Sequence, residues 1–168
     1  MTTTQTVVTD TNVLINFIHI QQLDLLNRLN DRGFIVPQHV IDEITWDNQA
    51  KALSLAFEEG HLHPCDLDDE ETEDLYNSLR SFIEAGEAAC IAIAHMRNCA
   101  VATDEKGDAE RIATELLGKK RLLRTESLLR QCIAAGLITV PEADAFKATL
   151  ATKRYAMKFA SFADLETA

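Results

Sequence analysis

Two aspartates stand directly after two similar apolar segments, Val7-Val8-Thr9-Asp10 and Val101-Ala102-Thr103-Asp104. Short runs rich in apolar and β-branched residues predict buried strands. Open α/β sheets build their functional sites at the carboxyl ends of parallel strands. Because neighbouring strands lie about 4.8 Å apart, Asp10 and Asp104 would converge if their two strands pair. The alternative for each residue is an ordinary helix cap, which an aspartate in this position often supplies.

Glu87 is a third acid in an unusual position. It begins the run Glu87-Ala88-Ala89-Cys90-Ile91-Ala92-Ile93-Ala94, which is apolar on every side and therefore indicates a buried helix. At 100° per residue, Glu87 falls on the same stripe as Ile91 and Ala94 and should point inward. Placement in the first helical turn stabilises a carboxylate by only about 0.3–1 kcal/mol, which does not offset the burial of an unpaired charge. A bound cation explains this acid most simply, and an arginine partner from elsewhere in the chain is the alternative.

Glu43 and Asp108 are weaker candidates for the same site. Glu43 lies about 60° from Val40 on a helical wheel, at the border of the apolar stripe. Asp108 follows Asp104 by four residues, one turn into the next expected helix, and so can face the same spot. Each could equally be an exposed helix charge. Carboxylates gathered in one pocket repel each other, and such all-oxygen sites suit Mg²⁺ or Mn²⁺, which can activate a water for attack on a phosphodiester.

These acids need a scaffold of alternating strands and helices to position them. Strands are expected at residues 6–9, 34–36, 61–65 and 99–103, and a weak fifth strand at 122–123. Helices are expected from residue 13, at 21–30, 37–59, 73–84, 87–97, 105–117 and 125–135, and from Pro141. The alternation predicts a parallel sheet covered on both faces. With neither a repeat nor a linker in the sequence, we expect a single domain over residues 1–168, ending in an extension, 152–168, of unassigned structure.

The charge of the chain is unevenly distributed. Its 168 residues carry a net charge of −11, but residues 1–84 hold 16 acids and 4 bases, whereas residues 85–168 hold 11 acids and 12 bases. A protein that binds nucleic acid through overall charge would be basic. Binding here would need a local basic patch or bound cations. The four widely spaced cysteines favour reduced thiols of a cytoplasmic protein, and neither a membrane span nor a signal peptide is visible.

The ordered set of acids resembles the PIN-domain nucleases. The matching segments are Asp10-Thr11-Asn12-Val13-Leu14, Glu43 in a helix after the second strand, Gly86-Glu87-Ala88-Ala89, and Thr103-Asp104 with Asp108. More narrowly, they resemble the VapC-like toxins of bacterial and archaeal toxin–antitoxin pairs. The resemblance runs from Val7 to about Ala113, and more weakly to Ile138. Residues 119–124 match poorly where the family's last strand should lie.

The resemblance implies a three-layer α/β/α sandwich around a mainly parallel sheet of about five strands, and Mg²⁺- or Mn²⁺-dependent cleavage of RNA. It implies metal ligands at Asp10, Glu43, Glu87, Asp104 and Asp108, of which Asp10, Glu87 and Asp104 are the first choice as catalytic residues. Asn12 and Thr103 match neighbours that orient the site. The resemblance also implies an antitoxin that covers the pocket, and a homodimer.

Basic residues supply candidates for RNA contact. Lys119, Lys120, Arg121 and Arg124 could follow RNA phosphates, or form a solvated loop and helix face. The segment Lys153-Arg154-Tyr155 with Lys158 mixes cations with an aromatic residue, as nucleic-acid or partner contacts do. His61 and His63 would share one face of a strand, but they lack a third metal ligand, which favours surface histidines.

Two other classes of function remain open. One is a haloacid-dehalogenase-like phosphatase with Asp10 as nucleophile. That mechanism needs a second acid two residues later as proton donor, where this sequence has Asn12. The other is a non-catalytic PIN-like module that only binds a partner. Metal-dependent cleavage of RNA, hydrolysis of a small phosphate ester, and binding without either reaction distinguish the three.

Overall fold

Five parallel strands form the centre of the molecule, in the order β3-β2-β1-β4-β5. The computed structural model describes residues 4–165. The strands are β1 (Gln5–Thr9), β2 (Arg32–Pro37), β3 (His63–Cys65), β4 (Ala100–Ala102) and β5 (Leu122–Leu123). Val8 of β1 pairs with Ile35 of β2 and with Val101 of β4. The two aspartate-ending segments are therefore neighbours, and the weak fifth strand is confirmed.

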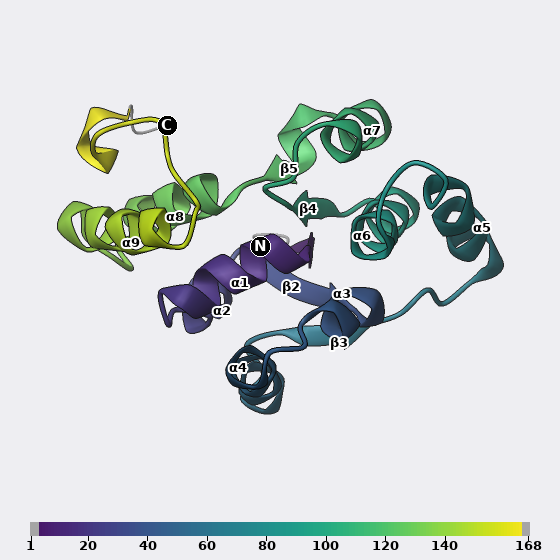
Figure 1. Cartoon of the computed structure of the whole chain (residues 1–168), viewed down its shortest axis with the longest axis horizontal. Coiled ribbons are helices and arrows are strands. Elements are labelled where there is room, and N and C mark those ends of the chain that lie inside the picture. Colours follow the sequence, from purple (N-terminus) through teal and green to yellow (C-terminus); the bar gives the residue numbers. More distant parts are fainter. Residues whose placement is uncertain (1–3, 166–168) are drawn as a thin grey trace.

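Helices cover both faces of the sheet and complete the expected three-layer α/β/α fold (Figure 1). One layer contains α5 (Glu70–Leu79), α6 (Ala85–Arg97) and α7 (Asp108–Leu117). The other contains α1 (Thr11–His19), α2 (Asp24–Arg28), α8 (Thr125–Ala134) and α9 (Val140–Thr152), with α4 (Asp47–Glu58) packed on α1. The short α3 (Gln38–Glu43) contacts both α1 and α6.

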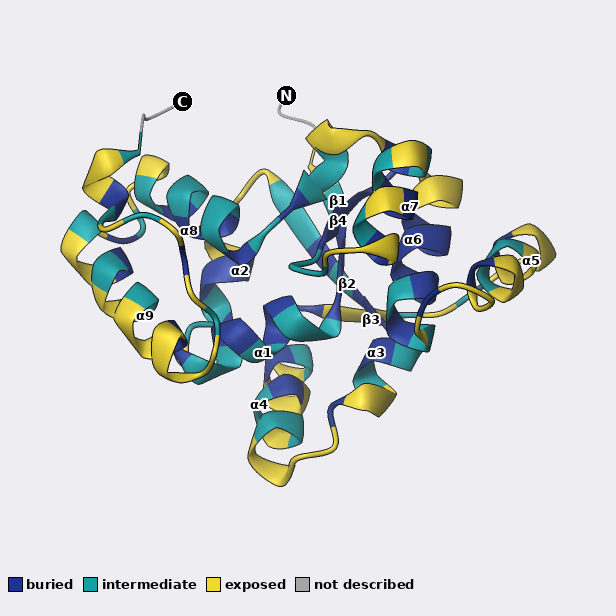
Figure 2. Ribbon diagram, turned by 45° about the horizontal axis from the view of Figure 1, so that its top comes forward, coloured by how far each residue is buried: buried dark blue, intermediate teal, exposed yellow. Residues whose placement is uncertain are grey.

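The helix expected at 87–97 is α6, and most of its residues are buried (Figure 2). From Ala88 to Ala94 its residues are at most 3% exposed, and the helix packs on β1, β2 and β4. Small alanine side chains allow this close approach to the sheet. The first turn of α6 is thereby fixed at the carboxyl end of the strands.

Two differences between the expected and the observed helices affect the site. The helix expected at 37–59 is two helices, because the chain leaves helical geometry at Ile44, whose side chain is only 5% exposed and packs into the core. The helix expected at 105–117 begins at Asp108, because Gly107 precedes it with φ +71°, a conformation that favours glycine. Residues 104–107 therefore form a loop, with consequences for the site.

The C-terminal extension is an ordered part of the fold as far as residue 165. After α9 the chain turns at Arg154, and Met157 and Phe162 are buried. Asp144 of α9 accepts hydrogen bonds from Ser161 Oγ (2.6 Å) and from the Phe162 backbone N–H (2.8 Å). These contacts hold the extension against α9.

No helix within residues 4–165 combines the length and the apolar composition that crossing a bilayer requires. The four cysteines are free thiols, and Cys90, Cys99 and Cys132 are buried.

Candidate active site

Acidic side chains from four separate segments line one pocket at the carboxyl edge of the sheet. The pocket has a volume of about 420 Å³. It is lined by Asp10, Thr11, Asn12 and Ile15 at β1 and α1, Glu43 at the end of α3, Glu84 and Glu87 at the start of α6, and Glu105 after β4. The topology brings these segments together because every strand ends at the same edge.

Asp10 is the buried acid of this pocket, with only 3% of its surface exposed. One carboxylate oxygen accepts the Thr11 N–H at 2.7 Å and caps α1, and the other accepts the Thr103 hydroxyl at 3.0 Å. Burial raises the pKa of Asp10 from 3.8 to about 6 despite these hydrogen bonds. The residue therefore caps a helix and also presents a poorly solvated carboxyl group to the pocket.

Glu87 lies in the first turn of α6, half-buried, where its Oε2 accepts the Glu84 N–H at 3.2 Å. Burial raises its pKa from 4.5 to about 7, and the negative charges of Glu105 and Asp10 raise it further. The ion pairs among residues 4–165 do not include Glu87, so the alternative of an arginine partner finds no support there.

Glu43 joins α3 to both α1 and α6. Its Oε2 accepts the Thr11 hydroxyl at 2.6 Å, and its Oε1 accepts the Gly86 N–H at 2.9 Å. A Cβ atom at position 86 would lie 2.6 Å from both carboxylate oxygens. Glycine at this position is therefore what allows Glu43 to approach the start of α6.

Glu105 is a pocket residue that the sequence analysis missed. Its carboxylate accepts the Asn12 amide at 2.8 Å, while Asn12 Oδ1 accepts the Asp104 N–H at 3.3 Å. Asn12 thus joins the pocket acid Glu105 to the backbone of Asp104. The signal in the sequence was the second acid after the fourth strand, but an expected helix from residue 105 obscured it.

Asp104 does not line the pocket, contrary to the expectation that it would converge with Asp10. One of its oxygens accepts the Thr125 N–H (2.9 Å) and the Tyr155 hydroxyl (3.1 Å). The other accepts the Thr125 hydroxyl (2.5 Å) and the Asn16 amide (3.1 Å). Four donors satisfy this carboxylate, which joins the loop after β4 to α1, α8 and the C-terminal extension.

Asp108 and most of the candidate bases also lie outside the pocket. Because α7 starts only at Asp108, its carboxylate is exposed and pairs with Arg111 at 3.1 Å. Lys119, Lys120 and Arg121 precede β5 and so lie at the amino edge of the sheet, opposite the pocket.

Two of the candidate arginines have structural partners. Arg121 donates to the carbonyl oxygens of Cys99 (2.9 Å) and Ala94 (2.7 Å). Arg124 follows β5 at the carboxyl edge and pairs with Glu110 at 2.5 Å. Of the four candidate bases, Arg124 alone shares an edge with the pocket.

The donor set of the pocket fits a hard divalent cation. Asp10, Glu43, Glu87 and Glu105 offer only oxygen atoms, and the ion pairs of the described chain leave all four without a cationic partner. In residues 4–165, no three acidic, histidine or cysteine side chains already converge as ligands. Mg²⁺ commonly keeps several waters and binds through one or two carboxylates, so a preformed cage is not required.

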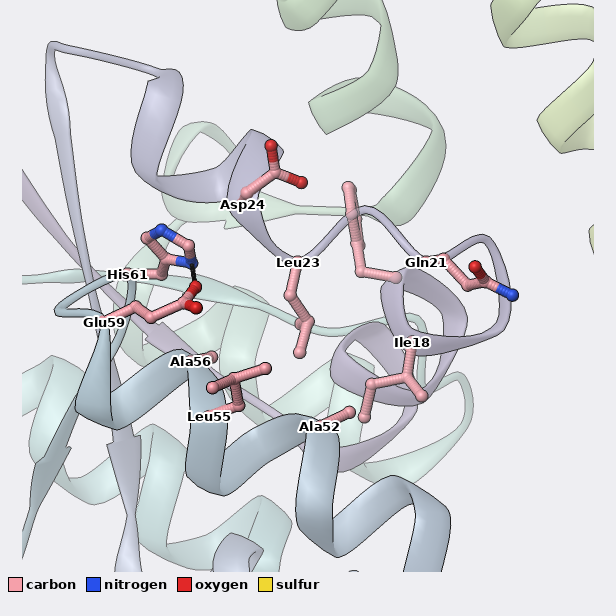
Figure 3. Close-up of a pocket in the computed structure, with 10 residues that line it drawn as sticks. Ile18, Gln21, Leu23, Asp24, Ala52, Leu55, Ala56, Glu59 and His61 are labelled. Atoms are coloured by element: carbon pink, nitrogen blue, oxygen red, sulfur yellow. Dashed lines mark ion pairs between the residues drawn. The ribbon is translucent and has the colours of Figure 1, made fainter.

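A second pocket, of about 260 Å³, lies between the end of α1, α2 and α4 (Figure 3). Ile18, Leu23 and Leu55 are among its lining residues. His61 lies at its rim, where its Nδ1 is 3.5 Å from Glu59. The lining is largely apolar, so the carboxylate pocket is the candidate active site.

Two of three comparisons with known proteins find a similarity. The family model described as "DUF3368: PIN domain" matches residues 6–152. The chain is similar to one in the crystal structure of VapBC2 from Rickettsia felis bound to a DNA fragment from their promoter. The identity is 15% and the TM-score 0.51, over 71% of this chain and 97% of that one, which is a likeness of fold. No curated protein matches.

Proposed function

This chain belongs to the PIN-domain family, and from that premise we propose that it is a metal-dependent endoribonuclease, the toxin of a toxin–antitoxin pair. The observation that carries the proposal is the pocket in which Asp10, Glu43, Glu87 and Glu105 gather at the carboxyl edge, outside the ion pairs of residues 4–165. Structural ion pairs would account for such acids only if bases faced them. An anionic, oxygen-only pocket is suited instead to a cation that meets a phosphodiester.

The residues that would hold Mg²⁺ or Mn²⁺ are Asp10 and Glu87 first, with Glu43 and Glu105 next. When bound, such a cation lowers the pKa of its water and stabilises the leaving oxygen of a phosphodiester. Asp104, proposed as a ligand from the sequence, acts in this arrangement by fixing the loop that carries Glu105. Asp108 is left outside the site.

Three polar neighbours, Thr11, Asn12 and Thr103, orient the carboxylates. Thr11 donates its backbone N–H to Asp10 and its hydroxyl to Glu43, so one residue sets the positions of two acids. Thr103 holds the second oxygen of Asp10, and Asn12 holds Glu105. Hydrogen bonds of this kind fix the acids before substrate binds, which is how a site avoids reorganisation during the reaction.

An antitoxin is the partner that the proposal requires. The structural neighbour from Rickettsia felis is a VapBC2 assembly on promoter DNA. By analogy we propose that an antitoxin segment covers the carboxylate pocket of this chain, and that the chain forms a homodimer. We expect a small adjacent reading frame that encodes a DNA-binding protein, and we expect that protein to co-purify with this chain.

Cleavage assays test the proposed activity. Purified, nuclease-free protein should cut single-stranded RNA with Mg²⁺ or Mn²⁺ but not with EDTA, and Asp10→Asn and Glu87→Gln should each abolish cleavage. Lys119→Ala, at the opposite edge of the sheet, is the matched control and should cut at nearly the wild-type rate. Hydrolysis of p-nitrophenyl phosphate without RNA cleavage would favour the phosphatase, and RNA binding without either reaction would favour a binding module.

A further inference from the structure

The segment after α9 contacts the loop that carries the pocket acid Glu105, although it follows the part of the chain that the family model matches, residues 6–152. Tyr155 Oη donates to Asp104 Oδ1 at 3.1 Å. The Asp104 N–H in turn donates to Asn12, whose amide holds the pocket acid Glu105. One chain of hydrogen bonds therefore connects the extension to the pocket.

The course of the segment follows α1 toward the pocket. Lys153 lies close enough to His19, the last residue of α1, for its positive charge to add to burial in lowering the pKa of His19. Two residues later, Tyr155 meets the same Asp104 carboxylate that accepts the Asn16 amide from the middle of α1. The segment thus passes from the far end of α1 to the loop behind the pocket.

The segment is held firmly enough to present its side chains in fixed places. Where the segment comes back to α9, Ser161 and Phe162 donate hydrogen bonds to Asp144. The side chains of Met157 and Phe162, both in the segment, are buried. The rings of Phe159 and Phe162 pack edge to face with centroids 4.9 Å apart. Apolar burial and these hydrogen bonds fix the extension without using its basic residues.

Three cations of the segment have no role in this anchoring. Lys153, Arg154 and Lys158 are exposed, and the ion pairs within residues 4–165 include none of them. By contrast, the arginines of α7 and the start of α8 are paired: Arg111 with Asp108 and Glu115, and Arg124 with Glu110. Lys106, beside the pocket acid Glu105, is likewise exposed and outside these ion pairs, but the C-terminal segment brings three such cations together.

We propose that Lys153, Arg154 and Lys158 bind the phosphates of single-stranded RNA, and that the C-terminal segment forms one wall of the substrate site. The inference rests on the proposed function, since it assigns the RNA contacts of that site. A pocket lined by carboxylates repels RNA, and a chain of net charge −11 offers no general attraction. A local track of cations outside the ion pairs of residues 4–165, running along α1 to the loop that carries Glu105, would supply the attraction.

Binding measured without catalysis tests the proposal. The affinity of full-length protein for a fluorescently labelled single-stranded RNA should be followed by anisotropy in EDTA over a series of salt concentrations. The variant K153Q/R154Q/K158Q should lower the slope of log affinity against log salt by about 2, because each phosphate contact on a single strand contributes about 0.7. Its affinity at low salt should fall by about tenfold or more.

K119Q/K120Q is the matched control, because it removes two exposed cations at the opposite edge of the sheet. It should leave the slope unchanged, and melting curves should establish that both variants fold. An unchanged slope in the triple variant, or an equal loss in the control, would overturn the proposal. So would a triple variant that keeps its RNA affinity and loses only the affinity for an acidic protein partner.

The outcomes separate this inference from the proposed activity. If the wild-type protein binds RNA through these cations but never cleaves it with metal, the nuclease proposal fails and the RNA track stands. If it cleaves RNA and the triple variant binds and cuts as wild type does, the activity stands and the track is overturned.

Discussion

The carboxyl groups of Asp10 and Glu87 are harder to ionise in the folded protein than in the unfolded chain. Their pKa values are raised to about 6 and about 7, from 3.8 and 4.5, chiefly by burial. As the pH rises from about 4, the unfolded chain releases these protons before the folded protein does. For this pair the free energy of unfolding of the metal-free protein should therefore decrease from about pH 4 to about pH 7, and change little above it.

Asp10→Asn isolates this effect, because it removes the charge and keeps the shape. In EDTA at pH 7.5 the variant should be more stable than wild type, by at most about 3 kcal/mol for a shift of two pKa units, less any lost hydrogen bond. Below about pH 4 the advantage should disappear. Melting curves of both proteins from pH 4 to 8 measure it, and a difference independent of pH would contradict the assignment.

Substitution of Asp104 should mainly lower stability, whereas substitution of its neighbour Glu105 should mainly lower the cleavage rate. Asp104→Asn puts an amide donor among four hydrogen-bond donors and should cost about 1–3 kcal/mol of folding free energy. Glu105→Gln keeps an acceptor for Asn12 on a partly exposed side chain, so stability should stay within about 0.5 kcal/mol, while cleavage falls by about tenfold or more. Melting curves and cleavage rates of the two variants decide this, and a stable, inactive Asp104→Asn would restore Asp104 to the site.

The sequence could position Asp10, Glu43 and Glu87 because Asp10 directly joins a strand to a helix and the two glutamates lie in helices, so strand ends and helical stripes determine direction. It could not separate Asp104 from Glu105, because the direction of a side chain in a loop depends on local hydrogen bonds. Here Thr103 Oγ accepts the Glu105 N–H at 3.1 Å and shapes the turn. The expected position of Asp108 was also wrong, because Gly107 delays the start of the helix from residue 105 to residue 108.

At the scale of elements, the approach of α3 to α6 depends on a missing side chain. Gly86→Ala would place a Cβ atom 2.6 Å from both oxygens of Glu43. The flexible Glu43 side chain can move away, and alanine favours a helix by about 0.5–1 kcal/mol over glycine. We therefore expect unchanged or slightly higher stability with a clear loss of metal-dependent cleavage.

A double-mutant cycle with Glu43→Gln tests this explanation. If Gly86→Ala acts by displacing Glu43, the two substitutions together should reduce cleavage little more than Glu43→Gln alone. Additive losses would show that position 86 acts by another route.

The pattern of strands was predictable because short apolar runs have few alternatives in an α/β chain. The edge at which a residue lies was also available from the sequence, since residues before a parallel strand lie at its amino end. Lys119, Lys120 and Arg121 precede β5, and that strand has only two residues, so a weak signal hid their position. The break between α3 and α4 was not predictable, because it depends on the burial of Ile44 in the tertiary structure.

For the whole molecule, the uneven charge now has a spatial meaning. Of the five acids that line the pocket, Asp10, Glu43 and Glu84 come from the acidic first half of the chain, and the second half contributes the three exposed cations of the C-terminal segment. A cation bound in the pocket would stabilise the charged forms of Asp10 and Glu87, whose pKa values burial and, to a smaller extent, like charges raise. Metal binding and global stability should therefore be linked.

Metal should raise the melting temperature of the wild-type protein by mass action. At about 100 times its dissociation constant, a ligand that binds only the folded state stabilises it by about 2.7 kcal/mol, which for a chain of this size corresponds to about 5–10 °C. The shift produced by Mn²⁺ should be larger at pH 8 than at pH 5.5, because Asp10 and Glu87 must lose their protons to bind it.

Asp10→Asn should respond much less, while K119Q/K120Q should respond as wild type does. Melting curves in EDTA and in a titration of Mn²⁺ measure these shifts. Equal shifts in wild type and Asp10→Asn would place the metal elsewhere, and no shift in wild type at millimolar Mn²⁺ would contradict a metal site in this pocket.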